Sequence, residues 1–150
     1  MVGSCTVTVL GVTLLCVVCV CVCVCVCVRA FQGKMVLVAA NLKPRAFAGL
    51  KSHGMVMCAS NQEHTKVELL VMPEGAEVGE RVMFEGHPGE PAAPGPFTKK
   101  KVLEKMMKAG FLVTNADCVA VYKGEDGVEV PFTLSTGVVK SSTLTGANVG

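Results

Sequence analysis

The sequence predicts a mainly β protein of the barrel or sandwich kind. Beyond residue 34, short apolar runs alternate with clusters of Gly, Pro and Asn, which is typical of short strands joined by turns. Only one stretch has the 3.6-residue periodicity of an amphipathic helix. A chain of 150 residues has room for one modest core, or for two small ones.

The apolar runs predict six strands and leave room for more at the end of the chain. The predicted strands cover residues 35–40, 55–60, 65–72, 81–84, 118–122 and 128–133. The last two form a hairpin around the turn at 124–127, and the tail at 137–150 offers one or two further short strands. The segments 41–54 and 87–96 are rich in Gly or Pro, so both are expected to be loops.

The single predicted helix covers residues 98–110. Thr98 is a suitable N-cap and Gly110 a suitable C′ residue. On a period of 3.6 residues, one stripe is apolar and lysines lie on the opposite side. The apolar stripe consists of Val102, Leu103, Met106 and Met107.

The first 28 residues carry no charged side chain, and residues 19–28 repeat the dipeptide Cys-Val five times. The run is long enough for a membrane helix, but alternation at period two with stiff β-branched Val is a poor helix pattern. A signal peptide is a second interpretation, but the segment has no basic n-region. A Cys-x-Cys metal site is a third, but the segment has no His and no charged neighbours. Because a repeated TG dinucleotide encodes Cys-Val, we interpret residues 1–33 as a low-complexity segment that arises from translated non-coding sequence and contributes no function.

Nothing in the remaining sequence predicts catalysis, a metal or a cofactor. Cys58 and Cys118 lie in apolar runs and are expected to be small core residues, and two isolated thiols are typical of a cytosolic protein. His53, His64 and His87 are single residues at loop-like positions. Glycine-rich phosphate-binding loops and nucleophile motifs are absent from the sequence.

The net charge of +2 conceals two basic segments. Residues 29–51 carry +5 and residues 98–108 carry +4, whereas residues 61–97 between them carry −5. Two separate basic segments on a nearly neutral chain favour a localised surface that binds a polyanion. The alternative is a pair of ordinary solvated surfaces.

The segment NLKPRAFAGLKSHGMVMCAS (residues 41–60) resembles the tRNA-binding domain family, that is, the EMAP-II/p43-type cofactor of synthetase complexes and the C-terminal extensions of methionyl- and tyrosyl-tRNA synthetases. The shared pattern is an apolar strand, N-L-x-P, a basic loop with Gly, and then S-x-G-M. The resemblance continues through PGEP, KKKVLEK and CVAVYKG and covers about residues 34–150. It implies a partial OB-fold at 34–86, a Greek-key β-barrel lacking its first strands, followed by a small EMAP-II-like β domain with one helix at 87–150.

The resemblance also implies a function without catalysis: the module would assist an aminoacyl-tRNA synthetase through shape and phosphate contacts to tRNA. The tRNA-binding residues carried over from the family are Asn41, Lys43, Arg45, Lys51, Ser52, Met55, Lys99, Lys100 and Lys101. Asn41 would shape the loop and the basic side chains would meet phosphates. Ser52 is equally interpretable as a turn former and Met55 as a core residue. The lysines at 99–101 either form a second phosphate patch or merely begin a helix, where the helix dipole disfavours them.

The alternative is a protein-interaction or cytokine-like module that docks onto synthetase-complex partners without binding tRNA. Family members carry further barrel strands before residue 35, where this chain has the Cys-Val segment. We therefore expect an N-terminally truncated barrel with an unpaired sheet edge, through which the chain could form a homodimer. The expected partners are tRNA and aminoacyl-tRNA synthetases rather than a membrane. The expected location of the protein is the cytoplasm.

Overall fold

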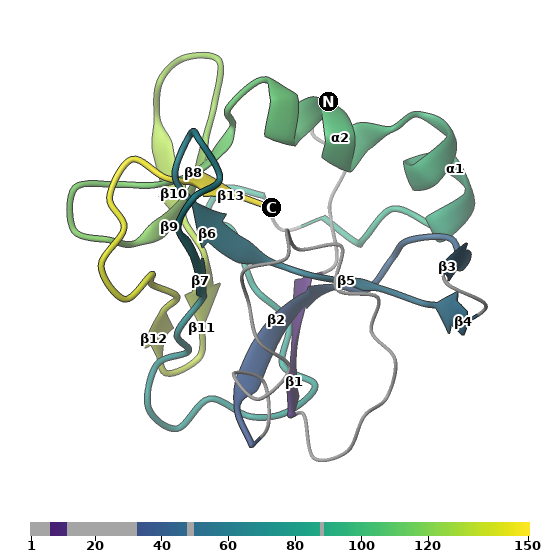
Figure 1. Ribbon diagram of the computed structural model, residues 1–150, viewed down its shortest axis with the longest axis horizontal. Helices are drawn as coiled ribbons and strands as arrows, with labels where there is room; N and C mark the ends of the chain where they lie inside the picture. Colours follow the sequence, from purple (N-terminus) through teal and green to yellow (C-terminus); the bar gives the residue numbers. More distant parts are fainter. Residues whose placement is uncertain (1–6, 12–32, 48–49, 88) are drawn as a thin grey trace.

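The computed structural model describes residues 7–11, 33–47, 50–87 and 89–150 (Figure 1). The elements, in chain order, are β1 (Val7–Gly11), β2 (Met35–Ala39), β3 (Arg45–Phe47), β4 (Leu50–Ser52), β5 (Met55–Val56), β6 (Cys58–Ser60), β7 (Val67–Leu69), α1 (Pro94–Lys99), α2 (Val102–Lys108), β8 (Leu112–Thr114), β9 (Ala120–Lys123), β10 (Glu129–Pro131), β11 (Thr133–Leu134), β12 (Gly137–Val138) and β13 (Asn148–Val149). The protein is mainly β, as the sequence predicts. Among the described residues, no helix is long and apolar enough to cross a membrane.

A three-stranded antiparallel sheet has the order β1-β2-β5. Strand β1 pairs with β2 over five residues, from Val7 opposite Ala39 to Gly11 opposite Met35. Strand β2 is therefore paired on both sides, by β1 and β5, and β1 is an outer strand of this sheet among the described residues. The expectation of an unpaired sheet edge stays a prediction. The Cys-Val repeat at 19–28, with its interpretation, lies outside the described residues.

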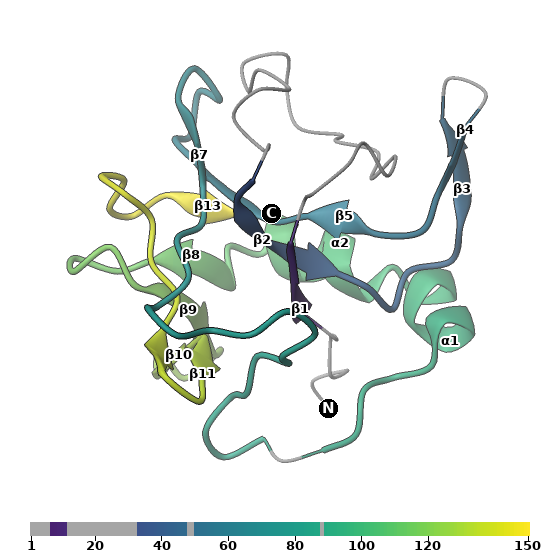
Figure 2. The ribbon, with the colours of Figure 1, turned by 90° about the horizontal axis from the view of Figure 1, so that it is seen from below.

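A second, six-stranded sheet has the order β10-β9-β8-β13-β6-β7. Only Met57 separates β5 from β6, and its N–H donates to the Leu37 carbonyl at 2.8 Å. The predicted strand at 55–60 is thus confirmed, and it passes from the small sheet into the large one (Figure 2). Strand β13 lies between β8 and β6, so the large sheet combines strands from both sides of residue 87. The division into domains at 34–86 and 87–150 stays a prediction.

The core forms on both faces of β2. Leu37 and Ala39 point into the main cluster, which includes Phe97 and Phe132, while Val36 and Val38 belong to a smaller cluster with Val56 and Cys58. Successive side chains of a strand point to opposite faces, so a strand buried on both sides reads as a continuous apolar run. Cys58 is a core residue as predicted, and burial raises the pKa of its thiol to about 11.

The predicted single helix is two short helices within the described residues, and it begins four residues earlier than expected. Lys101, at φ 50° and ψ 42°, adopts the left-handed conformation, which interrupts the helix between α1 and α2. Pro94 begins α1, since its fixed φ suits a first helical turn. Gly110 has a φ of 68° just after the C-cap Ala109, which confirms it as the C′ residue.

Several other predicted boundaries are wrong. The segment 41–54 is not only loop but contains the hairpin β3–β4. The predicted strand at 81–84 is not a strand: Arg81 and Met83 are single bridge residues, and Met83 pairs with Thr133. Cys118 is half-buried in a turn at φ 61° rather than in a strand. The hairpin β9–β10 and the two tail strands β12 and β13 are confirmed, and the predicted strand at 128–133 covers β10 and the first residue of β11. Strand β8 was not predicted.

Candidate nucleic-acid interface

The basic loop after β2 is anchored to the segment that leads into α1. The Asn41 side chain is buried, and its Nδ2 donates to the Ala92 carbonyl at 3.0 Å. Farther along, the Lys43 backbone N–H donates to Thr98 Oγ1, also at 3.0 Å. Figures 1 and 2 both show α1 beside the hairpin β3–β4. Two hydrogen bonds thus hold together segments that lie more than 50 residues apart in the sequence.

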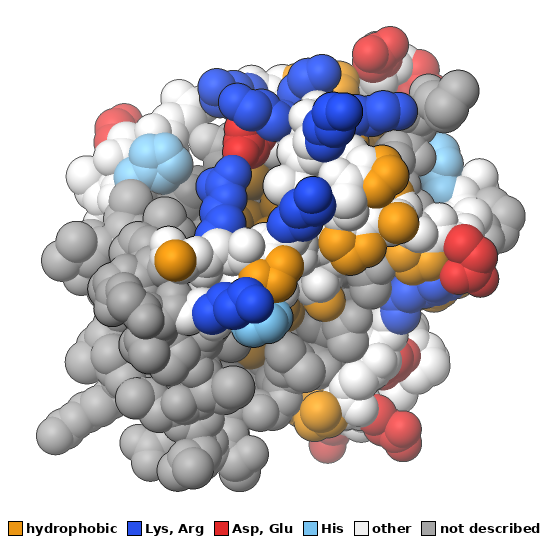
Figure 3. Space-filling model, turned by 90° about the vertical axis from the view of Figure 1, so that its right-hand side faces the viewer, with side chains coloured by type: hydrophobic (Ala, Val, Ile, Leu, Met, Phe, Trp, Pro, Cys, Tyr) orange, Lys and Arg blue, Asp and Glu red, His pale blue; other side chains and the backbone are white. Residues whose placement is uncertain are grey.

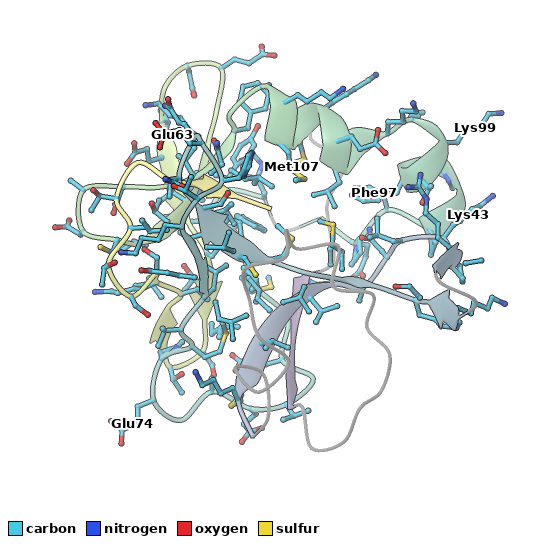
Figure 4. The ribbon with its side chains drawn as sticks, viewed as in Figure 1. Lys43, Glu63, Glu74, Phe97, Lys99 and Met107 are labelled. Carbon is cyan, nitrogen blue, oxygen red and sulfur yellow. The ribbon has the colours of Figure 1, made fainter. Side chains whose placement is uncertain are left out.

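Between this loop and the helix pair lies a groove of about 400 Å³, hereafter the groove. Its apolar lining includes Leu42, Met55, Phe97, Leu103 and Met107. Its basic lining consists of Lys43 and Arg45 on one wall and Lys101 on the other. Phe97 points inward, whereas Lys43 and Lys99 point away from the body of the protein (Figure 4). The arrangement is an apolar hollow with basic side chains at its margin.

The groove brings together five of the nine residues that the sequence singles out: Lys43, Arg45, Ser52, Met55 and Lys101. Lys51 and Lys99 are exposed and do not line the groove. Lys100 lines a second, separate hollow on the other side of α2, which neither Lys51 nor Lys99 lines. Asn41 lies behind the loop as an anchor, in keeping with the shaping role expected of it. Contact of these nine residues with RNA stays a prediction.

Ser52 and Gly54 explain the S-x-G-M motif. The buried Ser52 hydroxyl donates to the Gly54 carbonyl at 3.0 Å and closes the turn between β4 and β5. A Cβ atom on Gly54 would lie 2.8 Å from Val38 Cγ1 and 3.1 Å from the Ala39 carbonyl oxygen. Only glycine allows the turn to approach β2 this closely. Ser52 therefore serves as a turn former, one of the two roles considered for it.

The charge on this side of the molecule is strongly positive. Figure 3 shows Lys and Arg side chains gathered over it, with apolar side chains between them. We call this surface around the groove the basic face, and the exposed cations that line the groove there are Lys43, Arg45 and Lys101. Glu104 pairs with Arg45 at 3.8 Å, but both side chains are largely exposed, so the pair contributes at most about 1 kcal/mol. A phosphate can therefore displace Glu104.

Thr98 does not have the helix-capping role that the sequence predicts for it. Thr98 instead lies within α1 and accepts the hydrogen bond that fixes Lys43. No local pattern could reveal this contact, because its partners are 55 residues apart. The three histidines are exposed, as predicted. Within the described ranges, no group of three or more His, Cys, Asp or Glu side chains could hold a metal ion.

Comparison with known proteins agrees with this geometry. A family model described as "Putative tRNA binding domain" matches residues 2–81. A probable methionine–tRNA ligase of Oryza sativa subsp. japonica is 47% identical over 118 residues, covering 79% of this chain and 14% of that protein. The aminoacyl tRNA synthase complex-interacting multifunctional protein 1 of Mus musculus is 41% identical over 120 residues, covering 79% of this chain and 35% of that protein.

Among solved structures, the crystal structure of the C-terminal domain of Plasmodium vivax p43 matches with a TM-score of 0.75 and 25% sequence identity, covering 100% of this chain and 99% of that one. The fold and the groove thus define a small, mainly β module with an apolar groove that basic side chains border. The chain belongs to the tRNA-binding domain family, as its resemblance predicts. It spans only 14% to 35% of the length of the two curated relatives described above.

Proposed function

We propose that the basic face binds tRNA and that the groove lies at the centre of the contact. The observation that carries this proposal is the union of two basic segments, distant in sequence, around one groove. Membership of the tRNA-binding domain family supports the choice of tRNA among polyanions.

Phosphate contacts supply most of the affinity in this proposal. Arg45 presents a planar guanidinium that can bind two phosphate oxygens, while Lys43, Lys51 and the helix lysines act as point charges. Because the anchored loop fixes Lys43 and Arg45 relative to α1, the surface selects the spacing of phosphates along the RNA backbone. Recognition at the basic face is therefore by shape and phosphate spacing, because phosphate contacts carry no sequence information.

We further propose that the module is non-catalytic and increases the hold of an aminoacyl-tRNA synthetase on tRNA. The relatives support this role, since they include tRNA ligases and the "tRNA-aminoacylation cofactor arc1" of Schizosaccharomyces pombe. A cytoplasmic location agrees with relatives such as "Methionine--tRNA ligase, cytoplasmic" of Arabidopsis thaliana. A homodimer through the sheet edge expected at the start of the barrel stays a prediction, and β1 is an outer strand of the small sheet among the described residues.

The test is tRNA binding by fluorescence anisotropy across a series of salt concentrations. Each phosphate contact adds roughly 0.7–0.9 to the slope of log K against log salt. The double variant Lys43→Gln/Arg45→Gln should lower the slope by about 1.5 and the affinity by on the order of tenfold or more at low salt. Lys140→Gln is the matched control, because Lys140 is an exposed lysine outside both basic segments.

A chain that binds tRNA without salt dependence, or a Lys140→Gln variant that loses as much as the double variant, would contradict the proposal. Retention on a synthetase without retention of tRNA would instead support the docking alternative.

A further inference from the structure

A second hollow, of about 630 Å³, lies on the other side of the helix pair. Val102 lines both this hollow and the groove, so the two lie on either side of one helix junction. The remaining walls come from α2, from β9 and from the turn between β9 and β10. RNA bound along the basic face would thus pass within reach of it.

The floor of the second hollow is aromatic and its opposite walls carry opposite charges. Tyr122 makes edge-to-face contacts with Phe111 and His87, with ring centroids 6.1 Å and 6.0 Å apart. Lys100 and Lys105 line the helix wall, and Glu125 and Asp126 line the hairpin wall.

The charged walls do not neutralise each other. Within the described part of the chain, neither Lys100 nor Lys105 forms an ion pair, and Glu125 forms neither an ion pair nor a side-chain hydrogen bond. The carboxylates nevertheless act on the floor: burial raises the pKa of Tyr122, and the negative charges of Glu125 and Asp126 raise it further. A ligand that spans the hollow can therefore meet a cationic wall at one end and an anionic wall at the other.

A nucleotide has the matching chemistry. Its phosphate suits the lysine wall, its flat base suits an aromatic surface, and the N–H groups on the base edge suit a carboxylate. Guanine offers adjacent N1–H and N2–H donors that can meet both oxygens of one carboxylate, whereas adenine presents a single amino group beside an acceptor. The anionic wall thus favours guanine.

We propose that the second hollow binds an unpaired guanine nucleotide of the RNA that the basic face carries. Lys100 and Lys105 hold its phosphate, His87 and Tyr122 contact its base, and Glu125 accepts from its N1–H and N2–H groups. This inference rests on the proposed tRNA-binding function and adds a base preference to it.

The chain contains one tyrosine and no tryptophan, so its tyrosine fluorescence reports on this hollow. The experiment titrates the full chain with pentanucleotides that carry G, inosine or A at the centre of four uridines. We expect the G-centred RNA to quench Tyr122 and to bind roughly tenfold tighter than the A-centred RNA, since a good bidentate contact discriminates by about this much. Inosine, which lacks the N2 amino group, should lie between them.

Substitutions then separate the walls. Glu125→Gln should abolish most of the preference for guanine, whereas Lys100→Gln/Lys105→Gln should weaken G- and A-centred RNA equally. Glu74→Gln is the matched control, because Glu74 is an exposed glutamate that lies away from the helix pair (Figure 4).

Equal binding of the G- and A-centred RNAs to the unsubstituted chain would overturn the inference. Free guanosine monophosphate that bound as tightly as the pentanucleotide would overturn the assignment to RNA. Failure of the proposed function would give a different result. In that case Lys43→Gln/Arg45→Gln would leave tRNA binding unchanged, while the preference for the G-centred RNA would remain.

Discussion

Strand β2 and the basic loop that follows it are neighbours in the sequence but are held in different ways. β2 ends at Ala39, pairs with a strand on each side and is buried on both faces. The loop that follows leaves the sheets and is fixed by hydrogen bonds to Ala92 and Thr98. The structure of the first region follows from its local apolar pattern, whereas that of the second depends on contacts between residues more than 50 positions apart in the sequence. Four substitutions test whether the two regions depend on each other.

Phe97→Ala should have the largest effect, because Phe97 belongs to both regions. Its side chain is 1% exposed, lies in the main core and lines the groove. Loss of a buried Phe costs about 3–5 kcal/mol in the free energy of unfolding, measured by urea denaturation. Phe97→Leu, which keeps most of the volume, should cost about 1–1.5 kcal/mol and retain tRNA binding. An alanine variant of unchanged stability would show that the basic face does not rest on the core.

Gly54→Ala should be the next largest, since it forces the turn after β4 away from β2. The added Cβ meets Val38 Cγ1 and the Ala39 carbonyl, and the backbone atom cannot rotate away. We expect a loss of about 1–3 kcal/mol in urea denaturation. Gly89→Ala is the control, because nothing lies within 4 Å of a Cβ at that position. Equal losses in the two variants would refute the close-approach explanation.

The difference between the regions also decides what sequence could predict. The apolar run at 35–40 and the strand at 55–60 were predictable because burial on both faces leaves a continuous apolar pattern. β8 is three residues long and too short to carry a pattern. The break at Lys101 was hidden, because lysine has a good helix propensity and nothing in the local sequence indicates its left-handed conformation. The basic residues of the site were visible as charge, but their union around one groove depends on Thr98 and Asn41, whose long-range contacts leave no local signal.

Thr98→Ala tests that union with a smaller effect on stability. It removes the hydroxyl that accepts from the Lys43 N–H, at a cost of about 0.5–1 kcal/mol at this exposed site. The affinity for tRNA should fall several-fold at every salt concentration, with an unchanged salt slope, because the loop loosens while its charges remain. Thr98→Ser keeps the hydroxyl and should restore binding. A reduced slope in Thr98→Ala would mean that phosphate contacts, rather than loop order, had been lost.

Among the four substitutions, Glu68→Gln should have the smallest effect on the free energy of unfolding, and it should have no effect on the basic face. Burial by itself raises the pKa of Glu68, but hydrogen bonds from Thr143 and the nearby Lys66 outweigh it and leave the pKa below its usual value. A carboxyl whose pKa is lowered in the folded state stabilises the fold above its unfolded pKa, and this contribution disappears as pH falls through the folded value. Unfolding free energies measured between neutral and strongly acidic pH should therefore fall less steeply in Glu68→Gln than in the unsubstituted chain.

Since Glu68 lies on β7, at the far edge of the large sheet from the helix pair, the salt slope of tRNA binding should not change. A changed slope would show that the sheet edge and the basic face are coupled, and that anchoring through Asn41 and Thr98 does not isolate the loop from the rest of the fold.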